Sequence, residues 1–248
     1  MKCRLCQQES ELQNSHIISE AFWRGLYNEK HKALPISLDN NDLKPLQKGI
    51  REKLLCSACE GKFSKWENTL KRDLVDFGNL SSNFLNIKKV KRNLIFVEGI
   101  RYKNFKLSVL SLLWRMSISS DPFYSSYQLG PYDETLRSIL HSEINTNEKQ
   151  FPISVSRYEL DGAFYPDILM GFPQGKYSHV FTVQKFVISG HCFTIFVNNK
   201  TFPNITMDAF LRETGNLYID IRSLVELASP SGVISRIFDK DVENFYTT

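Results

Sequence analysis

Two Cys-x-x-Cys pairs carry the clearest chemical signal in this chain of 248 residues; they are formed by Cys3, Cys6, Cys56 and Cys59. Two intervening residues let both thiolates of a pair reach one ion, and four thiolates make the closed tetrahedral shell of a structural zinc site. Two disulfides or two redox-active pairs are the alternative interpretations. The spacing predicts one structural zinc ion that organises the N-terminal part of the chain.

The fifth cysteine, Cys192, lies in an apolar, strand-like run and is predicted to be inert core.

A histidine and a glutamate near these pairs are the candidates for catalysis. His16 follows Asn14-Ser15 and comes ten residues after Cys6. With an unperturbed pKa of about 6.5, imidazole can take a proton at neutral pH, although a structural His bonded to backbone is the alternative. Glu60 directly follows Cys59 and offers a hard oxygen to Mg²⁺. An acidic residue that merely favours the first turn of a helix is its alternative role.

These residues stand in a pattern that the chain shares with a known family. The matching segments are Cys3-x-x-Cys6, Ser15–Ile18 and Leu54–Cys59. Over about residues 1–75 the chain resembles the HNH (His-Me finger, ββα-metal) endonucleases that carry a four-cysteine zinc treble clef. It is also similar to a bacterial subgroup of HNH-like proteins. Their second cysteine pair, and a later helix that corresponds to Leu112–Arg115, resemble those of this chain.

The resemblance implies metal-dependent hydrolysis of DNA phosphodiester bonds. In the family the strand His is the general base, which makes His16 the base here. The residue beside that His and one on the following helix hold Mg²⁺ or Mn²⁺, which points to Ser15 and Glu60 as ligands of the catalytic metal. Related zinc-containing proteins of bacteria often act in restriction or phage defence, so this context is expected.

The chain departs from the family pattern at three places. Ser15 stands where an acidic residue or His is usual, and Glu60 replaces the terminal His. The middle Asn has no clear match, although Arg51 or Glu52 lies near its position. These departures keep open the alternative of a catalytically inactive zinc module that binds nucleic acid or a protein partner.

Positive charge gathers in the first half of the chain. Residues 1–106 carry 20 Lys and Arg against 12 Asp and Glu, whereas residues 107–248 carry 11 against 15. Such a basic half indicates a polyanionic partner, and DNA is expected, with RNA as the alternative. The predicted contacts with nucleic acid are Lys48, Arg51, Lys53, Lys62 and Lys65.

The first half is expected to place these residues on short extended segments and helices. An extended run at Glu11–Ile18 precedes a helix at Glu20–Tyr27. Residues 29–50, rich in turn-forming residues, are predicted to be a long loop. A helix at Glu60–Phe77 shows apolar residues at helical spacing and is expected to stop at Gly78.

The second half is predicted to be α+β with an antiparallel sheet. The expected elements, in order, are a helix at Phe105–Ile118, a helix starting at Pro131, strands at Ile153–Leu160, Val180–Ile188 and Cys192–Val197, a hairpin turn at Ser189–His191 and a final helix at Ile221–Ala228.

The overall fold class is therefore α+β in two parts. Residues 1–100 are expected to form the zinc-stabilised ββα-metal nuclease domain, and residues 101–248 an α+β domain that binds a partner or ligand or regulates the first. No apolar run approaches the length of about 20 residues that spans a bilayer, and the N-terminus has no apolar signal stretch. We expect a cytoplasmic protein without membrane contact.

Overall fold

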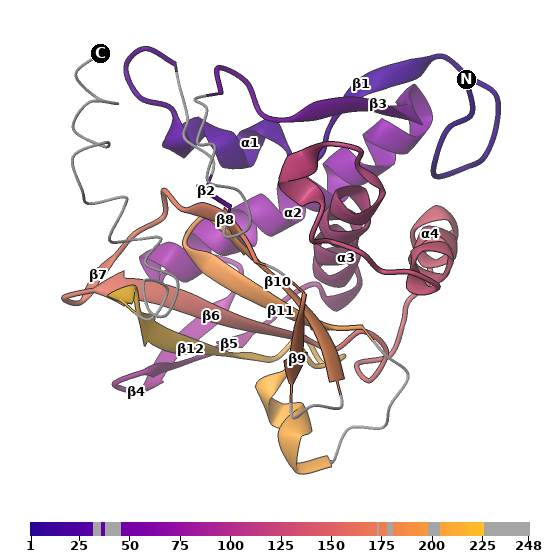
Figure 1. Cartoon of the computed structure of the whole chain (residues 1–248). Coiled ribbons are helices and arrows are strands. Elements are labelled where there is room, and N and C mark those ends of the chain that lie inside the picture. Colours follow the sequence, from indigo (N-terminus) through magenta and orange to yellow (C-terminus); the bar gives the residue numbers. More distant parts are fainter. Residues whose placement is uncertain (32–35, 38–45, 173, 178–180, 198–203, 226–248) are drawn as a thin grey trace.

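The computed structural model describes residues 1–31, 36–37, 46–172, 174–177, 181–197 and 204–225. Its α+β fold contains a two-stranded antiparallel sheet and a larger, ten-stranded mixed sheet. Figure 1 shows the two long helices, α2 and α3, between the small sheet and the large one. The helices therefore provide the packing layer that connects the cysteine-rich N-terminus to the rest of the chain.

The small sheet and α2 form a ββα unit. Strand β1 (Leu12–His16) pairs antiparallel with β3 (Arg51–Cys56), and β3 leads directly into helix α2 (Ser57–Asn79). Between the strands lie α1 (Glu20–Trp23) and the 3₁₀ turn η1 (Arg24–Leu26), which together occupy the predicted helix at Glu20–Tyr27. This unit contains Ser15, His16, Cys56, Cys59 and Glu60, whereas Cys3 and Cys6 lie just before β1.

Helix α2 is longer than predicted at both ends. It begins at Ser57, directly after Cys56, and passes through Gly78 to Asn79. The predicted stop at Gly78 is wrong, because the left-handed cap is Leu80, with φ of 52°. Leu80 donates its amide to the carbonyl of Asp76, which satisfies one carbonyl of the final turn.

Two of the three helices predicted in the second half are confirmed. Helix α3 (Tyr102–Ile118) is buried on nearly all sides, as its apolar sequence requires. The 3₁₀ turn η2 (Pro122–Tyr124) separates it from α4 (Tyr132–Ser142), which starts after Pro131. Helix α3 packs against both α2 and α4.

The large sheet has the order β2-β8-β10-β11-β6-β12-β5-β4, with β7 paired to β6 and β9 paired to β10. Its strands are β2 (Ile36–Ser37), β4 (Asn86–Lys91), β5 (Leu94–Glu98), β6 (Ile153–Leu160), β7 (Ala163–Phe164), β8 (Leu169–Gly171), β9 (Gly175–Tyr177), β10 (Phe181–Ile188), β11 (His191–Phe196) and β12 (Leu217–Ser223). A 3₁₀ turn, η3 (Asn204–Ala209), precedes β12. The three strands predicted here match β6, β10 and β11, and the hairpin between β10 and β11 turns at Ser189 and Gly190 as predicted.

Three expectations about this sheet need correction. It is mixed rather than antiparallel, because β12 runs parallel to β6 and β2 runs parallel to β8. Residues 221–223 of the predicted final helix belong to β12, since buried Leu217 and Ile219 alternate with more exposed neighbours as in a strand. The sheet also crosses the predicted boundary near residue 100, because β4 and β5 join it through β12.

Parts of the predicted loop and of the predicted final helix lie outside the described residues. Among the described helices, none combines the length and the apolar character needed to cross a membrane.

Candidate metal centre and the surroundings of His16

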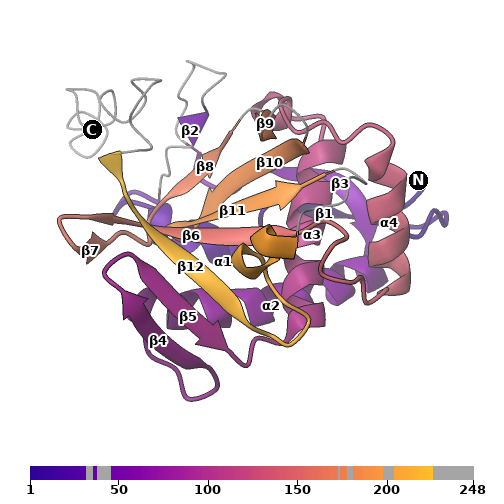
Figure 2. The ribbon, with the colours of Figure 1, turned by 90° about the horizontal axis from the view of Figure 1, so that it is seen from below.

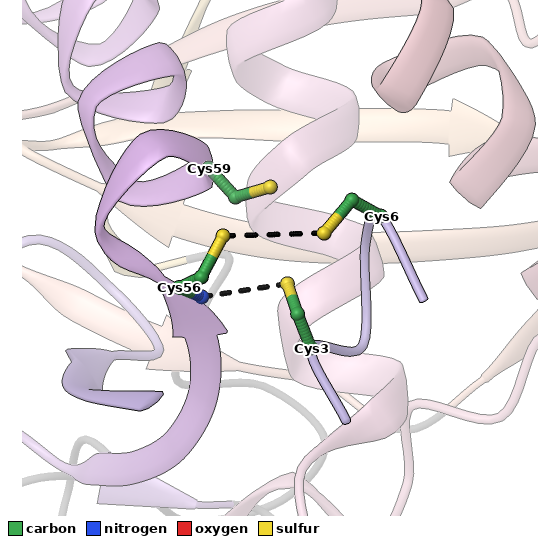
Figure 3. A group of neighbouring side chains, drawn as sticks. All are labelled: Cys3, Cys6, Cys56 and Cys59. Atoms are coloured by element: carbon green, nitrogen blue, oxygen red, sulfur yellow. Dashed lines mark hydrogen bonds between the residues drawn. The ribbon is translucent and has the colours of Figure 1, made fainter. Parts of the chain in front are cut away.

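The four cysteines predicted to bind zinc come together at one point. Their Sγ atoms all lie within 4.8 Å of one another, and the Sγ atoms of Cys6 and Cys56 are 3.9 Å apart. Zn–S bonds of about 2.3 Å in a tetrahedron place sulfurs about 3.8 Å apart, close to the observed value. Figure 3 shows all four side chains directed toward a common centre, so the donor set fits a structural zinc ion.

Two different backbone arrangements present these sulfurs. Cys3 and Cys6 lie on a tight turn, in which the amide of Cys3 donates to Gln8 and the amide of Gln7 donates to Cys3. Cys56 ends β3, and Cys59 occupies the first turn of α2. The amide of Cys56 donates to the Sγ of Cys3 at 3.4 Å, which connects the two arrangements directly.

Burial disfavours the charged thiolate form of these cysteines when no cation is bound. It raises the pKa of Cys6 and of Cys59. Burial also opposes ionisation of Cys3, but backbone amides, including that of Cys56, bring its pKa down to about 7. A divalent cation would supply the missing stabilisation, because it binds the thiolate form of each ligand.

His16, at the end of β1, is held between two side chains of opposite charge. Its Nε2 lies 3.0 Å from Oε2 of Glu20, and Nε of Arg51 donates to the same nitrogen at 2.8 Å. One nitrogen cannot accept from Arg51 and donate to Glu20 at once, so the two contacts belong to different tautomers. The tautomer of His16 therefore decides which neighbour it binds.

The same neighbours set the pKa of His16. Partial burial and the positive charge of Arg51 lower it, whereas the Glu20 carboxylate raises it, and the net pKa lies below the usual value. His16 is consequently neutral at pH 7, the form that can accept a proton. Partial burial opposes ionisation of Glu20, but its neighbours, His16 among them, lower its pKa below the usual value. Glu20 is therefore held ionised.

A buried ion pair fixes the backbone at His16. Arg115 of α3 pairs with Glu67 of α2, and both side chains are at least nine-tenths buried. The second amino group of Arg115 donates to the carbonyl oxygen of His16 at 2.8 Å. Arg115 thus joins three elements, and it positions the end of β1 relative to α2.

The two residues expected to bind a catalytic metal differ in their surroundings. Ser15 is buried, and its hydroxyl donates to the carbonyl of Gln13 at 3.4 Å. Glu60 is half-buried, and its Oε1 is buried without a hydrogen-bond partner among the described residues. A buried carboxylate oxygen in this state fits a cation ligand. Ser15, in contrast, already has an intramolecular partner.

Among the residues described, the cysteines form the one group of three or more His, Cys, Asp or Glu side chains whose ligand atoms lie together. Among the described residues, His16 and Glu60 therefore do not belong to a second group of three or more possible metal ligands.

The basic residues predicted to contact nucleic acid are mostly available. Lys48, Lys53 and Lys65 are exposed, and Arg51 is exposed but its guanidinium donates to His16. Lys62 differs, because it donates to the carbonyl of His141 at 2.8 Å and lies 3.3 Å from the carboxylate of Glu143. Its charge serves to connect α2 with the end of α4.

Sequence reasoning named Glu20 and Glu29 as residues that could approach His16, but it missed the pairing of Glu67 with Arg115. Glu20 stands four residues after His16, a spacing that brings the two together where the chain turns from β1 into α1. Nothing comparable marks Glu67 and Arg115, which are 48 residues apart in the sequence.

Comparisons of this chain with protein-family models, with curated proteins and with solved structures gave no match.

Proposed function

We propose that this protein is a metal-dependent endonuclease of the HNH type, with His16 as the general base and DNA as the substrate. The observation that carries the proposal is the ββα unit of β1, β3 and α2, with four clustered cysteines at one end and His16 at the end of β1. The cysteines are proposed to hold zinc in a treble clef, which keeps the two strands and the helix in place.

The contacts of His16 indicate which of its atoms acts. When Nε2 carries the proton and donates to Glu20, the lone pair of Nδ1 is left to accept a proton from water. A carboxylate on the far nitrogen also makes the ring more basic and fixes its orientation. When Arg51 donates to Nε2 instead, Nδ1 carries the proton and the base is blocked. The active state is therefore the one in which His16 binds Glu20.

Glu60 is proposed as the protein ligand of a divalent cation. Its orphaned Oε1 supports this role. When bound, Mg²⁺ or Mn²⁺ supplies stabilisation of the negative charge that develops on the phosphate and the leaving oxygen. The basic residues Lys48, Lys53 and Lys65 are proposed to contact the phosphate backbone, which would place the DNA along β3 and the start of α2.

A second function is favoured by the environment of Ser15. Its burial removes one of the two metal ligands that the family pattern supplies. The alternative is a zinc module that binds nucleic acid, or a protein partner, without cutting.

Cleavage of supercoiled plasmid separates the two functions. The assay compares wild type, His16→Ala, Glu60→Gln and His141→Ala with Mg²⁺ or Mn²⁺. His141 is an exposed histidine on α4 and serves as the matched control. Loss of a general base costs a factor of about 10² to 10⁴ in rate, so His16→Ala is expected to be nearly inactive and His141→Ala fully active. Equal cleavage by wild type and His16→Ala would refute the mechanism. Metal-dependent binding without cleavage by the wild type would favour the zinc module.

A further inference from the structure

The outer face of the large sheet, on the side away from α2 and α3, carries an aromatic pair. Figure 2 shows β4, β5 and β12 side by side on this face. Phe96 of β5 and Tyr218 of β12 are directly opposite in the register, with ring centroids 4.7 Å apart. Their neighbours Ile95 and Ile219 are buried in the main core, which also contains residues of α2 and α3, so alternation directs Phe96 and Tyr218 to the other face.

Positive charge lies directly beside this pair. Lys88 of β4 is the register partner of Phe96, which places Lys88, Phe96 and Tyr218 in one row across three strands. The hairpin of residues 86–98 carries four cations, Lys88, Lys89, Lys91 and Arg92, against one anion, Glu98. All four cations are exposed, and Lys88 approaches Glu98 only to 3.8 Å.

Ordinary sheet stability explains only part of this arrangement. Lysines on an edge strand prevent pairing with another chain, which accounts for the charges on β4. Strand β12, however, lies inside the sheet between β5 and β6, where no edge needs protection. Tyr218 nevertheless remains 36% exposed, in the half of the strand where its neighbours Leu217 and Ile219 are fully packed. A large aromatic side chain left open beside a basic hairpin indicates a ligand with flat rings and negative charge.

We propose that this face binds single-stranded nucleic acid. One base stacks on Phe96 and Tyr218, and the adjoining phosphates contact Lys88 in the same row and Lys91 and Arg92 at the tip of the β4–β5 hairpin. Unpaired bases expose the faces that such stacking needs, whereas a duplex hides them. The surface lies on the opposite side of the sheet from His16 and the cysteines, so it goes beyond the cleavage proposed for them (Figures 1 and 2).

Binding of a labelled oligothymidylate of about 12 nucleotides, measured by fluorescence anisotropy without added Mg²⁺, tests the proposal. The key variant is Tyr218→Leu, which keeps an apolar side chain on the strand but removes the aromatic ring. Tyr218→Phe keeps the ring and is expected to bind like wild type. Tyr165→Leu is the matched control, because Tyr165 is similarly exposed, at 40%, outside this face. Thermal unfolding of each variant shows that the fold is intact.

Tyr218→Leu is expected to weaken binding about tenfold, and Tyr165→Leu to leave it unchanged. Lys88→Gln with Arg92→Gln is expected to weaken binding and to reduce its dependence on salt. The proposal is overturned if wild type fails to bind the oligonucleotide at low salt. It is also overturned if Tyr218→Leu binds the oligonucleotide like wild type. The same holds if Tyr218→Leu weakens binding of a duplex of the same length as much as it weakens binding of the single strand.

Discussion

The buried pair of Arg115 and Glu67 allows a quantitative test of how His16 is positioned. In Arg115→Met, the Glu67 carboxylate stays buried without its cation, and the carbonyl of His16 loses its donor. Breaking a buried ion pair from one side costs about 3–5 kcal/mol, because an uncompensated charge remains. Glu67→Met should cost a similar amount, since it leaves the guanidinium of Arg115 unpaired in the same place.

The double variant distinguishes this account from simple loss of packing. Replacing both partners by apolar side chains of similar volume is often close to neutral, because neither charge is then left buried. We therefore expect Arg115→Met with Glu67→Met to be more stable than either single variant, with a coupling free energy of about 3 kcal/mol or more. Urea unfolding followed by tryptophan fluorescence, at saturating zinc, measures all four free energies of unfolding.

An exposed pair provides the control. Arg222 lies 2.8 Å from Asp220, with both side chains more than two-fifths exposed, so Arg222→Met should cost less than about 1 kcal/mol. Additive effects of Arg115→Met and Glu67→Met, with no coupling, would refute the reasoning. The double variant should also remain defective in cleavage even when stable, because nothing then holds the carbonyl of His16. Full activity in that variant would show that Arg115 does not position the base.

Three further predictions follow from the contacts of single residues. Glu20→Gln should lower the pKa of His16 and Arg51→Gln should raise it, because the two substitutions remove charges of opposite sign; an NMR titration showing shifts in the same direction would contradict this. Burial lowers the pKa of His191 from about 6.5 to about 3. Between these values the unfolded chain binds more protons than the folded one, so the stability of wild type falls as the pH drops from about 6.5 to about 3. Thermal melts should show that His191→Phe loses less stability than wild type over this pH range. Gly190→Ala should lower the free energy of unfolding by more than about 2 kcal/mol, because a Cβ at this positive φ would meet the carbonyl of Tyr165. Gly162→Ala has open space around the new Cβ and should cost only about 1 kcal/mol. Equal melting temperatures of the two variants would refute this difference.

Local patterns predicted the elements that depend on nearby residues. The cysteine spacing located the candidate metal centre, and helical periodicity located α2 and α3. The hairpin at Ser189 and Gly190 was also visible, since glycine readily takes the positive φ that this turn uses.

Long-range pairing was not predictable in the same way. The sequence shows apolar residues at alternate positions, Leu217, Ile219 and Ile221, which is typical of a strand. The strand was not predicted, because the residues from Ile221 onward were interpreted as a helix. The parallel pairing of β12 with β6 joins residues more than 60 positions apart, and no local pattern specifies it. The site shows the same division: Glu20 lies within reach of His16 by spacing, whereas Arg115 reaches His16 only through the packing of α3.

The zinc content of the purified protein tests the four-cysteine centre most directly, and the geometry proposed for His16 depends on that centre. Native mass spectrometry, supported by elemental analysis, should find one zinc per chain in wild type and in Cys192→Ser, whose buried thiol lies outside the cluster. Cys59→Ser should lose the zinc and unfold at a lower temperature, because metal binding contributes to folding. A wild type that contains no zinc under reducing conditions, or a Cys59→Ser variant that keeps both its zinc and its stability, would contradict the account.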